Sequence, residues 1–139
     1  MAAGFRSHQP GLKKLLGDLE ASIMEVVWSH PDGHRLAVRD VYETLRESRT
    51  IAYTTVMTVM GNLVKKDILK VEKSGTAYIY YAPLSREDFT AQAVGSIVDD
   101  LMSDFSSAAL AHFARVLDNQ PDEALARLRA RIEQAKQNQ

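Results

Sequence analysis

Residues 52 to 66 carry two chemically different sets of side chains that a helix would place on opposite sides. Successive helical residues lie about 100° apart around the axis. At that spacing one side collects the apolar residues Val56, Met57, Val59, Met60, Leu63 and Val64. The other side collects the polar residues Thr54, Thr55, Thr58, Asn62, Lys65 and Lys66. The apolar stripe would fix the helix on a core, and the polar side would face outward.

The polar side suits the major groove of DNA. Thr and Asn present short donors and acceptors to base edges, Thr methyl groups contact thymine methyl groups, and Lys reaches phosphates. These residues therefore predict a recognition helix. A Thr-rich helix on a solvated protein surface has the same composition, so the neighbouring elements have to decide between the two interpretations.

The elements that precede this helix follow the order of a helix-turn-helix. Apolar residues recur with helical spacing over residues 18 to 28, where Asp18 is the expected N-cap. Residues 31 to 33, Pro-Asp-Gly, predict a turn, and residues 35 to 37 are long enough for one short strand. Residues 38 to 48 repeat the helical spacing. Two helices leading through a short link into a third indicate a helix-turn-helix.

A β-hairpin is predicted directly after the recognition helix. The apolar period changes to two over residues 68 to 73 and 77 to 81, and Ser-Gly-Thr separates the two runs. Lys73 lies near the expected tip, where a wing meets the sugar-phosphate backbone. The tyrosines of the second run are expected to pack on the core and the neighbouring strand rather than on bases.

Residues 85 to 139 are predicted to be helical throughout. Ser85 and Asp88 resemble a capping box, and Pro121 is a favourable first residue for the last helix. A winged-helix core does not need these three amphipathic segments, so we expect a second copy of the chain to cover them. A helical cap on the core of the same chain is the alternative. The expected dimer surface consists of Phe89, Ile97, Leu101, Phe105, Leu110, Phe113, Leu117, Leu125, Leu128 and Ile132.

Length, composition and charge limit the class of protein. The 139 residues are 45% hydrophobic, which is enough for one domain or a small domain with an appendage. The chain has no cysteine, which excludes disulfides and thiolate metal sites. No apolar run reaches the roughly 18 residues of a membrane span, and the N-terminus lacks the apolar core of a secretory signal. A cytoplasmic protein without direct membrane binding is expected.

The chain divides by charge as well as by pattern. The residues before position 85 include eleven Lys or Arg and nine Asp or Glu, whereas the later residues include six and nine. The basic excess therefore accompanies the predicted recognition helix. The expected organisation is a flexible arm over residues 1 to 17, a winged-helix DNA-binding domain over 18 to 84 and a helical dimerisation domain over 85 to 139. The fold class is mostly α with a small β-hairpin wing.

These motifs closely resemble the penicillinase repressor family of winged-helix transcriptional repressors, which includes the methicillin-resistance repressors. The most specific match is Tyr-Thr-Thr-Val-x-Thr-Val at residues 53 to 59, followed by Leu-Val-Lys-Lys at residues 63 to 66. The resemblance covers nearly all of the chain after residue 17. It implies a homodimeric repressor that binds an inverted-repeat operator containing TACA and TGTA elements and that needs no cofactor.

Carried over by position, the resemblance assigns roles to particular residues. The base contacts fall on Thr54, Thr55, Thr58 and Asn62, and the phosphate contacts fall on Tyr53, Lys65, Lys66 and Lys73. In the β-lactam branch a membrane-bound sensor-protease detects the antibiotic, and the repressor is cut within its dimerisation domain. The family's scissile bond is typically Asn-Phe, and the matching residues here are Asp104 and Phe105. The family also often has Arg at the position of Asn62, and its copper branch uses C-terminal cysteines that this chain lacks.

Two other classes of function fit the sequence less well. An enzyme would need clustered catalytic groups, but His30 and His34 flank Asp32 on a predicted turn, and no glycine-rich phosphate loop is present. We therefore expect no catalytic residues and no metal site. A winged helix that binds protein would use the same fold, but such modules usually expose an apolar or acidic face rather than Thr, Asn and Lys.

Overall fold

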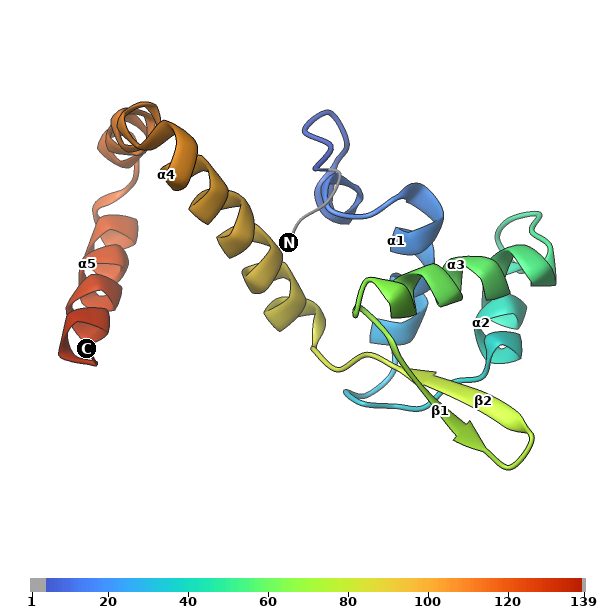
Figure 1. The fold of residues 1–139 in the computed structure, drawn as a ribbon. Coiled ribbons are helices and arrows are strands. Elements are labelled where there is room, and N and C mark those ends of the chain that lie inside the picture. The colour runs from blue at the N-terminus through green and yellow to red at the C-terminus, as the bar shows by residue number, and fades with distance from the viewer. Residues whose placement is uncertain (1–4, 139) are drawn as a thin grey trace. The chain divides into compact units, whose positions relative to one another are not determined.

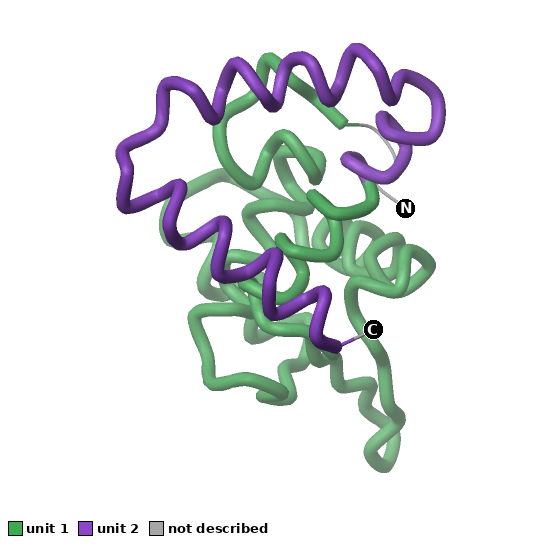
Figure 2. The backbone as a smooth tube through the Cα atoms, turned by 90° about the vertical axis from the view of Figure 1, so that its left-hand side faces the viewer, with its two compact units in different colours: residues 1–96 green, residues 97–139 purple. Residues whose placement is uncertain are grey.

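The computed structural model describes residues 5 to 138 (Figure 1). The chain forms two compact units, divided between residues 96 and 97 (Figure 2). No helix that the structure describes is long and apolar enough to cross a membrane. The elements in chain order are η1 (Gly11–Lys14), α1 (Asp18–Trp28), α2 (Val38–Leu45), α3 (Tyr53–Lys65), β1 (Lys70–Ser74), β2 (Ala77–Tyr81), α4 (Arg86–Asp118) and α5 (Asp122–Gln137).

Three helices of the first unit pack around one hydrophobic core. Helices α1, α2 and α3 each bury an apolar stripe with helical spacing. Ile23 and Met24 of α1, Val41 of α2, and Val56 and Met60 of α3 are completely inaccessible to solvent. Burying a side chain of this size stabilises a fold by about 1.5–3 kcal/mol relative to leaving it exposed. This core holds α3 in a fixed rotation about its axis.

The start of α1 is held by charged side chains. Oε1 of Glu20 accepts a hydrogen bond from the backbone N–H of Gly17 at 3.1 Å, which satisfies a donor that the helix leaves free. The sequence indicated Asp18 as the N-cap, but Asp18 is the first helical residue and Gly17 is the cap. The carboxylate of Asp18 instead pairs with Lys13 at 3.0 Å and Arg49 at 3.3 Å. Hydrogen bonds from Lys13 and then Arg49 lower the pKa of Asp18.

Strands β1 and β2 form the predicted antiparallel hairpin. Gly75 in its turn has a φ of 65°, which a residue without a Cβ adopts without strain. Leu36, in the stretch predicted as a short strand between the first two helices, pairs with Tyr80 as an isolated bridge and forms no longer strand. Strand β1 begins two residues later than predicted, because the N–H of Ile68 donates to the carbonyl of Leu63 and caps the end of α3.

The segment predicted as a flexible arm contributes to the core. Within it, residues 11 to 14 form η1, and Leu16 is only 2% exposed. Leu12 and Leu15 also pack against the core. A single 3₁₀ turn is too short to show a periodic pattern, which is why the sequence did not reveal it. The structure therefore differs from the predicted arm in this stretch, and residues 1 to 4 lie outside the described residues.

The first turns of α4 belong to the first unit. The indole Nε1–H of Trp28 donates to the carbonyl of Leu84 at 3.1 Å, and its ring lies 5.3 Å from that of Phe89 between centroids. Arg86 pairs with Glu25 of α1 at 2.7 Å. The sequence predicted that the winged-helix domain ends at Leu84 and that Phe89 belongs to the dimer surface. In the structure the first unit continues to residue 96, and Phe89 has an aromatic partner within its own chain.

The second unit has no buried side chain among its described residues. Helix α4 contains one residue with non-helical geometry, Phe105, whose φ is −136° and ψ is 44°. Phe105 therefore divides α4 into two helical parts across a kink, as the two separate helices predicted from the sequence require. Pro121, predicted as the first helical residue, is the N-cap of α5. None of the residues from 97 to 138 is buried, so the apolar side chains of this unit stay accessible in a single chain.

Candidate nucleic-acid interface

Helix α3 carries the predicted contact residues on its exposed side. Val56, Met60 and Leu63 are completely buried at spacings of four and three residues, so the opposite side of the helix must face outward. No acidic residue occurs in α3, so no carboxylate of this helix opposes a phosphate. The exposed side carries Thr54, Thr55, Thr58, Asn62, Lys65 and Lys66.

Met57 belongs to the exposed side of α3 and not to the buried apolar stripe in which the sequence pattern placed it. The helical pattern grouped it with the apolar stripe, but its side chain is 45% exposed. Met57 follows Thr54 by three residues, so the two side chains are neighbours on the helix surface. A flexible apolar side chain at the edge of a polar face is suited to contact a thymine methyl group. The sequence analysis missed this residue because the position of a side chain around the helix axis does not by itself determine how far that side chain is buried.

Two of the predicted phosphate-binding lysines have unpaired ammonium groups. Lys65 in the last turn of α3 and Lys73 in the wing form no ion pair within the part of the chain that the structure describes. Lys73 lies opposite Tyr78 in the hairpin register, and Tyr78 is 57% exposed. Exposed cations of this kind exchange counterions for DNA phosphates.

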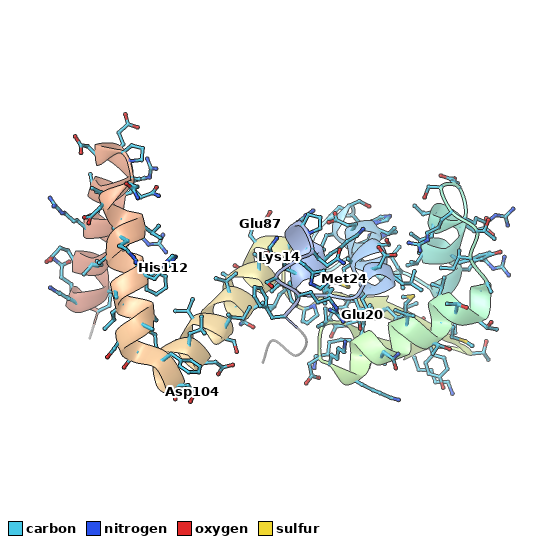
Figure 3. The ribbon with its side chains drawn as sticks, turned by 90° about the horizontal axis from the view of Figure 1, so that it is seen from above. Lys14, Glu20, Met24, Glu87, Asp104 and His112 are labelled. Atoms are coloured by element: carbon cyan, nitrogen blue, oxygen red, sulfur yellow. The ribbon has the colours of Figure 1, made fainter. Side chains whose placement is uncertain are left out.

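Lys66 is different, because its ammonium group already has a partner. Nζ of Lys66 lies 2.7 Å from Oε2 of Glu20, the residue labelled near the start of α1 in Figure 3. The side chain of Glu20 is only 13% exposed, and its other oxygen accepts the hydrogen bond from Gly17. The pair therefore joins the end of α3 to the start of α1. This contact counts against Lys66 as a phosphate contact.

Replacing Lys66 is expected to affect stability more than DNA binding. The change Lys66→Gln leaves a half-buried carboxylate without its cation and should lower the free energy of unfolding by about 1 kcal/mol. The matched change Lys65→Gln removes an unpaired surface cation and should alter it by less than about 0.5 kcal/mol. Urea denaturation of both variants measures the difference. Equal losses of stability would show that the Lys66 pair does not join the two helices energetically.

Tyr53, predicted to contact phosphate, begins α3 and is 38% exposed. Its ring meets Tyr42 edge to face with centroids 5.5 Å apart, and the guanidinium of Arg39 lies 6.0 Å from its centroid. The pKa of Tyr80 is raised, mainly because its phenol is partly buried and secondly because the phenols of Tyr53 and Tyr78 are nearby. The start of α3 therefore lies among aromatic and cationic groups that the sequence analysis missed. Arg39 and Tyr42 are three residues apart on α2, a spacing that could have revealed a shared face.

Arg35 fixes the base of the wing. Its guanidinium lies 3.9 Å from the ring centroid of Tyr81 in β2, and its Nη2 lies 2.9 Å from Oε1 of Glu72 in β1. Nη1 also donates to the carbonyl of Gly33 at 2.7 Å. One side chain thus connects both strands to the loop before α2, which gives the hairpin a defined direction relative to α3 within the first unit.

Comparison with known proteins identifies the family. Residues 16–134 match the family model described as the penicillinase repressor. The chain belongs to this family. The transcriptional regulator BlaI of Mycobacterium tuberculosis (strain H37Rv) is 36% identical over 122 residues, covering 85% of each chain. The penicillinase repressor of Bacillus licheniformis is 26% identical over 80 residues, covering 56% of this chain and 60% of that one. A solution structure of the DNA-binding domain of the repressor BlaI matches with a TM-score of 0.45 and 26% identity, covering 52% of this chain and 85% of that chain.

Penicillinase repressors are transcriptional repressors and not enzymes, so membership confirms the predicted class. The three helices and the hairpin of the first unit are the elements that the sequence predicted for a winged helix. The chain is thus a DNA-binding transcriptional repressor. The two histidines that flank Asp32 stack on each other: the rings of His30 and His34 lie 4.8 Å apart between centroids on the turn after α1. Nδ1 of His30 lies 3.0 Å from the carbonyl oxygen of Val26, so this ring is engaged with the end of α1.

The predicted dimer residues of the second unit all reach the surface of the single chain. Most of them are large and at least one-third exposed, with Phe105 the most exposed at 62%. The exposed members are Leu101, Phe105, Leu110, Phe113, Leu128 and Ile132. The half-buried members are Ile97, Leu117 and Leu125.

Proposed function

We propose that this chain represses transcription as a homodimer that binds an inverted-repeat operator through α3 and the wing, and that a β-lactam or cell-wall stress releases it. The outer face of α3 carries the proposal. Its short polar side chains project from a helix whose rotation is fixed by three fully buried residues, Val56, Met60 and Leu63. A rigid helix with donors and acceptors close to its backbone is what major-groove reading requires.

The contacts divide by chemistry. Side chains that reach base edges provide specificity, and cations or phenols at the ends of α3 and in the wing hold the phosphates on either side. Lys66 is left out of the phosphate set because its ammonium pairs with Glu20. The base set is Thr54, Thr55, Thr58 and Asn62, and the phosphate set is Tyr53, Lys65 and Lys73.

Two copies of the chain fit both the DNA and the protein. Exposed Leu, Phe and Ile side chains along α4 and α5 leave apolar surface that a second copy would remove from water. Two recognition helices roughly 34 Å apart then address two half-sites of an inverted repeat. A dimer that holds two linked half-sites binds far more tightly than a monomer that holds one half-site.

Electrophoretic retardation at two salt concentrations tests the proposal. We expect an inverted repeat of TACA and TGTA elements to bind more tightly than a random duplex. We also expect both affinities to fall steeply with salt, because each phosphate contact adds about 0.9 to the slope of log K against log salt. The change Lys73→Gln should lower that slope by about one unit per subunit. A protein that retards neither duplex would instead be a protein-binding winged helix.

The bend in α4 supports release by proteolysis. Phe105 interrupts the helical geometry and is 62% exposed, and Asp104 lies at the bend in Figure 3. A protease must open the backbone of its substrate locally, and an interrupted helix opens at lower cost than a continuous one. We propose that a membrane-bound sensor-protease cuts between these two residues.

Mass spectrometry of the protein from cells exposed to a β-lactam measures this cut. The expected product ends at Asp104, and the change Asp104→Asn should speed its appearance if the protease pocket hydrogen-bonds a neutral amide. Removing α5 and the later part of α4 would then weaken the dimer. An intact chain in cells whose target genes are induced would mean that a ligand or a partner releases the operator without cleavage.

A further inference from the structure

The exposed side of α2 carries a second group of cationic and aromatic side chains next to the recognition helix. Tyr42 and Glu43 lie three and four residues after Arg39, and Arg46, the C-cap of α2, lies three residues after Glu43 and four after Tyr42. These spacings place the four side chains on one side of α2 and its C-terminal end. Tyr42 meets Tyr53 of α3 edge to face at 5.5 Å between centroids. This side of α2 is therefore continuous with the first residue of α3.

Both arginines lie against this aromatic pair. The guanidinium of Arg39 is 6.0 Å from the ring centroid of Tyr53, and that of Arg46 is 5.7 Å from the ring centroid of Tyr42. Their side chains are 73% and 55% exposed. An exposed guanidinium resting on a ring keeps its donors available, and its planar fork matches a phosphate.

Glu43 lies between the two arginines and pairs weakly with each. Its Oε1 is 3.7 Å from Nη1 of Arg39 and 3.5 Å from Nη1 of Arg46, beyond ordinary charge-assisted hydrogen-bond distance. Because one carboxylate is shared by two guanidiniums, the group has a net charge of +1 that is available to a phosphate. Lys66 differs from these arginines, because its ammonium lies 2.7 Å from the carboxylate of Glu20, which is only 13% exposed.

We propose that Arg39 and Arg46 bind phosphates beside the groove that α3 enters, and that Glu43 competes with those phosphates for the two arginines. The proposal rests on the proposed function, because it needs α3 to bind DNA. It adds a sequence-independent contact on α2 that the predicted phosphate set does not contain. It also gives Glu43 a defined effect: its carboxylate lowers the affinity for every duplex.

Four single variants of the full chain test this inference, with the predicted inverted repeat and a random duplex as probes. Arg39→Gln and Arg46→Gln should each lower the salt slope by about 0.9 per subunit, equivalent to about eightfold in affinity over a tenfold change in salt. Glu43→Gln should raise the affinity for both duplexes by about twofold to eightfold. Glu47→Gln is the matched control, because it removes the same charge just after α2 and pairs with neither arginine in the described structure.

The measurements separate failure of the inference from failure of the proposed function. If the unaltered protein binds neither duplex, the proposed function fails and the inference falls with it. If the protein binds and both arginine variants keep its salt slope, the inference alone is overturned. A Glu43→Gln variant that binds no more tightly than the Glu47→Gln control also overturns it. Thermal midpoints equal to that of the unaltered protein are expected for all four variants, because every altered side chain is exposed.

Discussion

A chain that ends at Ser96 is expected to fold as a monomer and to bind the operator about 100-fold to 10,000-fold more weakly than the full chain. The first unit keeps its whole core in this form, including the contact between Trp28 and Phe89. The removed residues are those whose apolar side chains have no buried environment in one chain. Loss of the dimer would separate the two recognition helices, so each half-site would be bound alone.

A shorter chain that ends at Pro83 serves as the control for where the first unit ends. It lacks the Leu84 carbonyl that accepts the Trp28 hydrogen bond, and it lacks the Phe89 ring. We expect it to be about 2–3 kcal/mol less stable than the chain ending at Ser96. Sedimentation, urea denaturation and retardation of the operator compare the two. A Ser96 chain that sediments as a dimer would place the interface in the first unit.

The helices of the first unit could be predicted closely because local pattern and tertiary burial agree there. The predicted span of residues 18 to 28 is the observed α1, and the recognition helix ends within one residue of its prediction. In both helices the apolar residues repeat with a period that matches the side facing the core. The hairpin was also predictable, since Gly75 provides the positive φ that its turn adopts.

Long-range partners could not be predicted from local pattern. Lys66 and Glu20 are 46 residues apart, and nothing in the spacing of either helix indicates that they pair. Phe89 has the helical spacing of its predicted stripe, but its ring packs on Trp28 of α1. Periodicity identifies which side of a helix is apolar and does not identify what covers it. The residues whose predicted roles differ from the structure are those whose side chains contact a different helix.

Replacing Thr58 by Ala is expected to reduce discrimination between the operator and a random duplex by about 1–3 kcal/mol, or about 5-fold to 150-fold. Thr58 lies in the middle of the exposed side of α3, one helical turn from both Thr54 and Asn62. Ala favours a helix more than Thr by a few tenths of a kcal/mol, so the variant should fold at least as well as the original. The lost affinity would then report the contact itself.

Two further variants identify which part of the Thr58 side chain reads the base. Thr58→Ser keeps the hydroxyl and removes the methyl group, whereas Thr58→Val keeps a methyl group and removes the hydroxyl. If a hydrogen bond to a base edge dominates, the Ser variant retains discrimination and the Val variant loses it. If contact with a thymine methyl dominates, the order reverses. Retardation of both duplexes by each variant gives the comparison, with Thr44→Ala of α2 as a control that should leave discrimination unchanged. Equal losses for the operator and the random duplex in the Thr58→Ala variant would contradict base reading, because a residue that only positions the helix on phosphates weakens both alike.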